Sequence, residues 1–182
     1  MRAGFLQGTL RLTRPLEKGH LVAIFKDHRF SSTADWVEGE RVLVSSRDKT
    51  TINVVVPPEL GGPDAGVWSP EELLLAACAS SYELTLLAVA KRAEIPIHSL
   101  EVRTTGHVTR CADSVLGFVV VEIDVDLVTS PEQLIHAQAA AMRAKEVCIV
   151  TIALDVPVQL RVNARTEVAQ LEEMGPKSLA RR

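Results

Sequence analysis

Three cysteines carry the most distinctive chemistry in this chain, and they are Cys78, Cys111 and Cys148. They are an odd number in a chain whose first 20 residues contain no continuous apolar run of the kind found in a secretion signal. This count argues against a framework of structural disulfides. It favours reduced thiols or a single redox pair.

The histidines and serines give weaker indications of a functional site than the cysteines. The five histidines lack metal-ligand spacing, and the chain has no CxxC or HxxxH pair, so we expect neither a metal nor another cofactor. Ser80 and Ser81 could suggest a hydrolase. Their context, AACASSYE, lacks the glycine-flanked strand-turn-helix elbow that exposes a nucleophilic serine, which argues against that chemistry.

Composition narrows the class of protein. A chain of 182 residues that is 47% hydrophobic can bury one core, so we expect a single domain. Its 20 basic and 23 acidic residues give a net charge of -3 without a basic block, which argues against nucleic acid or an anionic membrane surface as a partner. No apolar run reaches the ~20 residues that cross a bilayer, so we expect a soluble, cytoplasmic protein.

The first half of the chain predicts a three-stranded meander. Residues 34–46 form two strands around the Glu38-Gly39-Glu40 turn, and the β-branched residues of 50–56 predict a third strand. Pro57 and Pro58 end that strand. We interpret residues 1–33 as an N-terminal extension.

A strongly marked helix follows. Ser69 is a suitable N-cap, Pro70 occupies the first helical position, and Glu72 completes a capping box, so the helix begins at Pro70 and extends to about residue 93. This segment is apolar nearly all round and contains both Cys78 and Ser81. Such a pattern predicts a central helix packed between a sheet and a second helix.

The second half predicts two long strands at 97–109 and 117–128, joined by a turn at 111–114. Ser130-Pro131-Glu132 repeats the cap signature and predicts a helix that ends near Cys148. A last strand is expected at about 156–163. Residues 165–182 are polar and predict a C-terminal tail, which leaves 34–164 as the domain.

This order of elements and two motifs resemble the OsmC/Ohr family. The motifs are the PxELGG segment followed by the Pro-Glu-x-Leu helix start, within VVVPPELGGPDAGVWSPEELLLAACASS, and CIVTIAL at 148–154. The resemblance implies an α+β, OsmC-like fold with two central helices packed on bent antiparallel sheets. It also implies an intertwined homodimer with active sites at the dimer interface.

In active relatives, a cysteine on the first helix attacks a peroxide and becomes a sulfenic acid, a second cysteine resolves it as a disulfide, and a dithiol reductant recycles the enzyme. By this resemblance the catalytic glutamate is Glu71 and the resolving cysteine is Cys148. The family's nucleophile position, eleven residues after Pro70, holds Ser81, which cannot form a sulfenic acid. Cys78 lies about one turn earlier on broadly the same face and is the candidate displaced nucleophile.

The family also uses an arginine before the third strand, and here Arg41 is the first candidate and Arg47 competes with it. Structural alternatives accompany the redox roles. Cys78 and Cys148 could each be small core residues, and Glu71 could simply complement the helix dipole. Cys111, which matches no family position, reads as an incidental exposed thiol or as the site of an intermolecular disulfide.

Two functions therefore stay open. The first is a thiol-dependent peroxidase that reduces small hydrophobic peroxides through Cys78 and Cys148, in oxidative stress defence. The second is a non-peroxidase relative that binds a small hydrophobic ligand at the dimer interface and keeps both cysteines as core residues.

Overall fold

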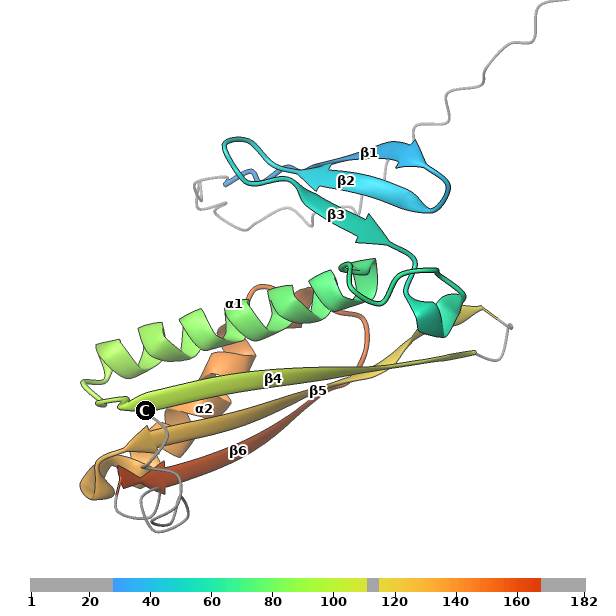
Figure 1. Cartoon of the computed structure of the whole chain (residues 1–182). Helices are drawn as coiled ribbons and strands as arrows, with labels where there is room; N and C mark the ends of the chain where they lie inside the picture. The colour runs from blue at the N-terminus through green and yellow to red at the C-terminus, as the bar shows by residue number, and fades with distance from the viewer. Residues whose placement is uncertain (1–27, 111–114, 168–182) are drawn as a thin grey trace, which may run out of the picture. The chain divides into compact units, whose positions relative to one another are not determined.

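The computed structural model describes residues 28–110 and 115–167, and every helix and strand below belongs to the compact unit that begins at Ser32 (Figure 1). Most of the expected N-terminal extension, the 111–114 turn with Cys111, and most of the expected C-terminal tail lie outside the described residues.

The predicted meander is present. Strands β1 (Thr33–Glu38), β2 (Arg41–Ser45) and β3 (Ile52–Val55) form an antiparallel sheet in the order β1-β2-β3. Gly39 closes the β1–β2 turn with a φ of 49°, a left-handed conformation that glycine adopts without strain. After β3 the chain forms a short 3-10 turn, Pro58–Leu60, and returns to the strand, where Val55 N donates to Trp68 O at 3.0 Å.

Helix α1 (Pro70–Arg92) begins with the predicted capping box. The Ser69 hydroxyl accepts from Glu72 N at 3.1 Å, and Ser69 N donates to the Glu72 carboxylate at 2.8 Å. Its buried residues recur every four positions, as one stripe made of Cys78, Tyr82, Leu86 and Ala90.

By length and composition α1 could cross a membrane, so the prediction that no segment reaches that size was too strong. Three residues of its buried stripe, Tyr82, Leu86 and Ala90, belong to the hydrophobic core of an α+β domain.

The second sheet is mixed. Strand β4 (Ser99–Arg110) pairs antiparallel with β5 (Leu116–Thr129), whereas β6 (Val158–Thr166) pairs parallel with β5. The prediction of purely antiparallel sheets was therefore wrong for β6. A parallel pair needs a long crossover, and helix α2 supplies it.

Helix α2 (Leu134–Val147) follows a 3-10 turn, Pro131–Gln133, and precedes another, Thr151–Ala153. Ser130 makes no side-chain capping bond, so the repeated sequence signature produces a different helix start. The helix buries a face of small residues: Ala137, Ala140, Ala141 and Ala144.

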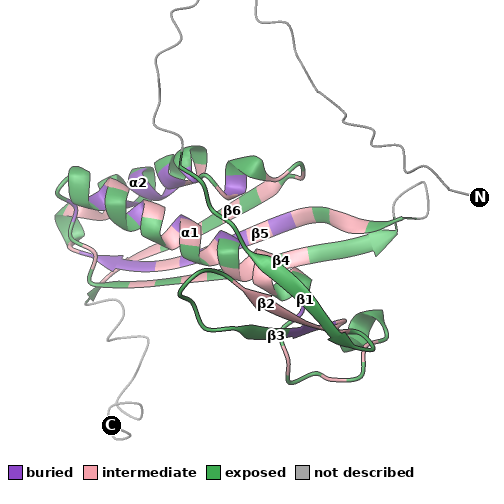
Figure 2. Ribbon diagram, turned by 90° about the horizontal axis from the view of Figure 1, so that it is seen from above, coloured by how far each residue is buried: buried purple, intermediate pink, exposed green. Residues whose placement is uncertain are grey.

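Both helices cover one face of the β4-β5-β6 sheet (Figure 1). Alternation along β5 buries Ile123, Val125 and Leu127, which belong to one hydrophobic core with Tyr82 and Leu86. Figure 2 shows buried segments on β5, α1 and α2. Because α1 and α2 share this core, it fixes their relative positions.

Candidate functional site

Helix α1 brings Ser81 against Cys148. The Ser81 Oγ lies 3.3 Å from the Cys148 Sγ, within hydrogen-bonding distance for sulfur. Cys148 is the C-cap residue that directly follows α2, and its extended backbone leads toward the Thr151–Ala153 turn. The residues that the family resemblance assigns to the nucleophile position, Ser81, and to the resolving position, Cys148, are therefore in direct contact.

The Cys148 sulfur is fully buried but well supplied with hydrogen bonds. Burial alone raises the pKa of this thiol. Hydrogen bonds from Ser81, from the backbone and hydroxyl of Thr151 and from the backbone of Val150 outweigh burial, so the pKa lies below its ordinary value. The Thr151 hydroxyl is shared, because it also lies 3.2 Å from the Cys148 carbonyl oxygen. This arrangement stabilises a thiolate.

Cys78 is equally buried but differs in its surroundings. Burial raises the pKa of its thiol, and the negative charge of Cys148 raises it further. Within the described part of the chain its sulfur has no hydrogen bond, and both cysteines are free thiols. Cys78 therefore stays protonated when Cys148 ionises.

Tyr82 is a contributor that the sequence did not single out. Its buried hydroxyl donates to the Ala141 carbonyl oxygen at 2.9 Å and so joins α1 to α2 beside Ser81. Burial raises its pKa far above the usual value, with a smaller contribution from the Cys148 charge. Tyr82 is the only tyrosine in the chain and directly follows Ser81. Its position beside Ser81 is the one feature of the sequence that could have identified it as part of the site.

The predicted arginine and glutamate are not brought together. Arg41 Nη2 lies 3.9 Å from Asp64 Oδ2, and Arg41 lines a separate hollow with residues of the β1–β2 turn. Glu71 has one carboxylate oxygen buried without a hydrogen-bond partner among the described residues. Arg47 is exposed in the β2–β3 turn.

Glu71 lines a cavity of about 610 Å³. Leu60, Val108 and Leu116 supply apolar surface, and Arg110 also lines it. Cavities of this size accommodate small molecules. Neither Cys78 nor Cys148 lines this cavity. Glu71 and the two cysteines therefore do not share a pocket.

The other polar groups of the described residues do not form a metal site or a hydrolase site. In the described residues no group of three or more His, Cys, Asp or Glu side chains is placed to hold a metal ion. Ser80 donates to the Ala76 carbonyl oxygen at 2.7 Å inside α1, so it is not exposed on an elbow like a hydrolase nucleophile.

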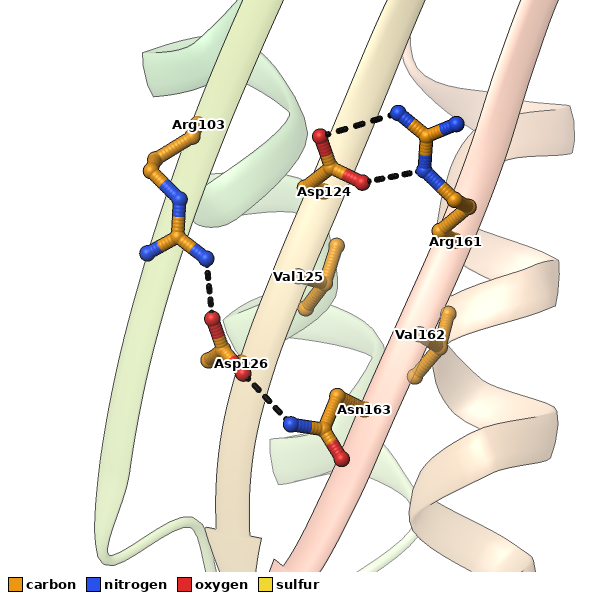
Figure 3. Close-up of a pocket in the computed structure, with 7 residues that line it drawn as sticks. All are labelled: Arg103, Asp124, Val125, Asp126, Arg161, Val162 and Asn163. Carbon is orange, nitrogen blue, oxygen red and sulfur yellow. Dashed lines mark hydrogen bonds and ion pairs between the residues drawn. The ribbon is translucent and has the colours of Figure 1, made fainter.

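A hollow of about 200 Å³ on the outer face of the β4-β5-β6 sheet is lined by paired charges (Figure 3). Arg161 Nε donates to Asp124 at 2.6 Å, Arg103 pairs with Asp126, and Asn163 donates to Asp126 at 2.7 Å. The aspartate carboxylates already accept hydrogen bonds from these side chains, so we interpret the network as stabilising the sheet surface.

A comparison with protein families assigns this fold to a known family. The model of the OsmC-like protein family matches residues 62–163, which include α1, both long strands, α2 and Cys148. The chain belongs to the OsmC-like protein family. The match includes both Ser81 and Cys148.

Individual members of the OsmC-like family are distant in sequence. The uncharacterized protein YmaD of Bacillus subtilis is 25% identical over 152 residues, covering 78% of this chain and 97% of YmaD.

Solved structures confirm the OsmC-like fold. An OsmC-like protein of unknown function from Vibrio cholerae has a TM-score of 0.68 at 16% identity, covering 75% of this chain and 100% of that one. An organic hydroperoxide resistance protein from Elizabethkingia anophelis has a TM-score of 0.66 at 20% identity, covering 78% and 99%. At these identities the likeness concerns the fold.

Proposed function

We propose that this OsmC-like protein is a thiol-dependent reductase of organic hydroperoxides in which Cys78 and Cys148 form the redox pair. The observation that carries the proposal is the Cys148 thiol, held by several hydrogen bonds and with a lowered pKa, beside a second buried thiol. A thiolate is the form of cysteine that reacts with peroxides. The similar fold of the organic hydroperoxide resistance protein from Elizabethkingia anophelis supports this proposal.

The reaction balances with these two thiols and an external dithiol. One thiolate attacks the hydroperoxide, the O–O bond breaks, the sulfur becomes a sulfenic acid, and the alkoxide leaves as the alcohol after taking a proton. The second thiol then displaces water from the sulfenic acid to form a disulfide. A dithiol such as a lipoyl group returns the disulfide to two thiols and is itself oxidised.

Exposed apolar side chains surround the segment that carries Cys148. Val147, Ile149 and Ile152 are 38%, 69% and 63% exposed. An apolar approach favours alkyl hydroperoxides over hydrogen peroxide. We therefore propose small hydrophobic peroxides as the substrate class.

We also propose that the protein acts as a cytoplasmic homodimer. Helices α1 and α2 leave large apolar side chains exposed, and the most exposed are Leu84 at 68% and Ile135 at 77%. A second copy that covers them would remove this surface from water. Dimers also accord with what the family resemblance implies.

A second candidate function is binding of a small hydrophobic ligand without redox turnover. The cavity beside Glu71 favours it, as does the pairing of Arg41 with Asp64 instead of with Glu71. In that case both cysteines would be core residues only.

Hydroperoxide consumption distinguishes the two functions. Three proteins are compared: the native chain, Cys78→Ser and Cys148→Ser. Each is assayed for consumption of tert-butyl or cumene hydroperoxide with dithiothreitol or a lipoyl donor as the reductant. Free thiols are counted before and after addition of the peroxide. We expect turnover in the native chain, oxidation of two of its three thiols, and loss of turnover in both variants. No consumption and an unchanged thiol count would contradict the peroxidase and favour ligand binding.

A further inference from the structure

We propose that Cys148 is the thiolate that attacks the hydroperoxide, that Ser81 orients it, and that Cys78 is the resolving thiol. The inference rests on the proposed function and reverses the order of attack that the family resemblance implies. It also gives Ser81 a role at a position where it cannot be the nucleophile.

The first argument is the set of donors around the sulfur. The Ser81 Oγ is 3.3 Å from the Cys148 Sγ. A thiolate has no proton to donate, so in the ionised state the Ser81 hydroxyl must be the donor of this bond. The turn after α2 adds the backbone N–H groups of Val150 and Thr151. Cys78 has no comparable donor among the described residues.

The second argument is the order in which the thiols ionise. The Cys148 pKa is lowered and the Cys78 pKa is raised, although both side chains are fully buried. Part of the rise at Cys78 comes from the Cys148 charge. Conversion of Cys148 to a neutral sulfenic acid removes that charge, so oxidation of the first thiol makes the second easier to ionise.

The third argument is position. Cys78 precedes Ser81 by three residues in α1, which is about 4.5 Å along the helix axis and broadly the same face. This places Cys78 on the part of α1 near Cys148, whose charge acts on the Cys78 thiol.

The exposed surface next to Cys148 in the chain is apolar. Ser81 is half-buried, whereas Ile149 and Ile152 are exposed. An alkyl group can pack on this apolar surface, which is the exposed surface nearest along the chain to the buried sulfur.

In the first step the Cys148 thiolate takes the terminal oxygen of ROOH as the O–O bond breaks, and RO⁻ leaves and is protonated to ROH. In the second step the Cys78 sulfur attacks the Cys148 sulfur of Cys–SOH. The hydroxide that leaves takes the Cys78 proton, which gives one disulfide and one water. The dithiol reductant of the proposed function supplies the two electrons that restore both thiols.

Trapping the first sulfenic acid tests the order of attack. Cys78→Ser and Cys148→Ser are treated with tert-butyl hydroperoxide and dimedone, and adducts are mapped by mass spectrometry. We expect an adduct at Cys148 in Cys78→Ser and none at Cys78 in Cys148→Ser. An adduct at Cys78 in Cys148→Ser, alone or at a comparable rate, would overturn the inference while leaving the proposed function standing.

The native chain provides the same test without a substitution in the core. Rapid trapping should place the earliest dimedone adduct on Cys148, and an earliest adduct on Cys78 would overturn the order. A native chain that neither consumes hydroperoxide nor gives an adduct at either cysteine would overturn the proposed function together with the inference.

The pH dependence of Cys148 oxidation tests the role of Ser81. Loss of one hydrogen bond to the thiolate makes the thiolate fraction roughly tenfold smaller. This loss is partly offset because a more basic thiolate is a better nucleophile. In Ser81→Ala we expect a higher pH midpoint for oxidation and a rate at pH 7 that falls about threefold.

Two further variants separate positioning from a general effect on the helix. Ser81→Thr keeps the hydroxyl and should restore the native midpoint. Ser80→Ala removes the neighbouring hydroxyl, which bonds to Ala76, and should leave the midpoint unchanged. An unchanged midpoint in Ser81→Ala, or the same shift in Ser80→Ala, would overturn the role assigned to Ser81.

Discussion

At the scale of the residue, Cys78 and Cys148 show that burial alone does not decide the character of a thiol. Both are fully buried, yet their pKa values move in opposite directions. The difference comes from the hydrogen bonds at Cys148, because each donor stabilises the thiolate directly and offsets the loss of water. One of these donors, Ser81, comes from another helix, so the ionisation of Cys148 depends on how α1 and α2 pack.

The contact between Ser81 and Cys148 predicts that a thiol at position 81 can form a disulfide with Cys148. In a Cys78→Ser background, Ser81→Cys should oxidise readily with diamide, because the native side-chain atoms are already 3.3 Å apart. A disulfide needs a separation of about 2.05 Å, which a small side-chain rotation can supply. Peptide mapping and thiol counting would measure the loss of both thiols.

The matched control is Ser80→Cys in the same background. Ser80 bonds to the Ala76 carbonyl oxygen and is exposed, so its substitution should leave Cys148 reduced. Equal cross-linking from positions 80 and 81 would show that the contact at Ser81 is not specific.

Part of this site was accessible from the sequence. The resemblance to the OsmC/Ohr motifs identifies Ser81 and Cys148 in the sequence. The sequence could not predict the donors at Val150 and Thr151, because they depend on the turn that follows α2. The assignment of Arg41 as the partner of the catalytic glutamate also stays a prediction, since within one chain it pairs with Asp64.

At the scale of the element, local sequence signals predicted the positions of helices and strands well. They did not predict how strands distant in the sequence pair. The capping box at Ser69 and the alternation of β5 depend on nearby residues, and both are present in the structure. Strand β6 pairs parallel with β5, and the residues of β6 alone do not determine its partner or its direction. Ser130 carries a cap-like sequence but makes no capping bond, since its helix begins as a 3-10 turn.

The two serines therefore form a matched pair for a stability measurement. Ser69→Ala should lower the free energy of unfolding by about 1 kcal/mol, because it leaves the Glu72 N–H without its acceptor at the start of α1. Ser130→Ala should change it by no more than a few tenths of a kcal/mol, since no side-chain cap is lost. Urea unfolding of both variants would measure the difference, and equal losses would contradict the capping argument.

At the scale of the whole molecule, charges are distributed unevenly over the β4-β5-β6 sheet. One face packs against the helices, and the other carries the ion-pair network of Figure 3. Hydrogen bonds from Arg161 to Asp124, and from Arg103 and Asn163 to Asp126, hold the pKa values of both carboxyls below their ordinary value. This network makes the outer face suitable for water.

Lowered carboxyl pKa values predict how stability depends on acid. In the unfolded chain these aspartates titrate at about 3.9. Their contribution is therefore complete above that pH and is lost as the pH falls through the lower pKa values of the fold. We expect the free energy of unfolding to decline below about pH 4 and Asp126→Asn to weaken that decline. Urea titrations between neutral and acidic pH would measure it, and an identical acid slope in the variant would contradict the assignment.

The opposite side of the domain presents apolar residues instead, and this asymmetry predicts which surface a second copy covers. Leu84 on α1 is 68% exposed, although its helix is apolar nearly all round. Leu84→Asp should convert the proposed dimer to monomers in analytical ultracentrifugation, because burial in an interface would leave the new carboxylate unpaired and without water. Thr105→Lys places a charge on the exposed strand β4, where Glu122 is its cross-strand neighbour, and should remain dimeric. A dimeric Leu84→Asp would place the contact between copies elsewhere, because an aspartate at the centre of an apolar interface costs more than such an interface can offset at micromolar concentration.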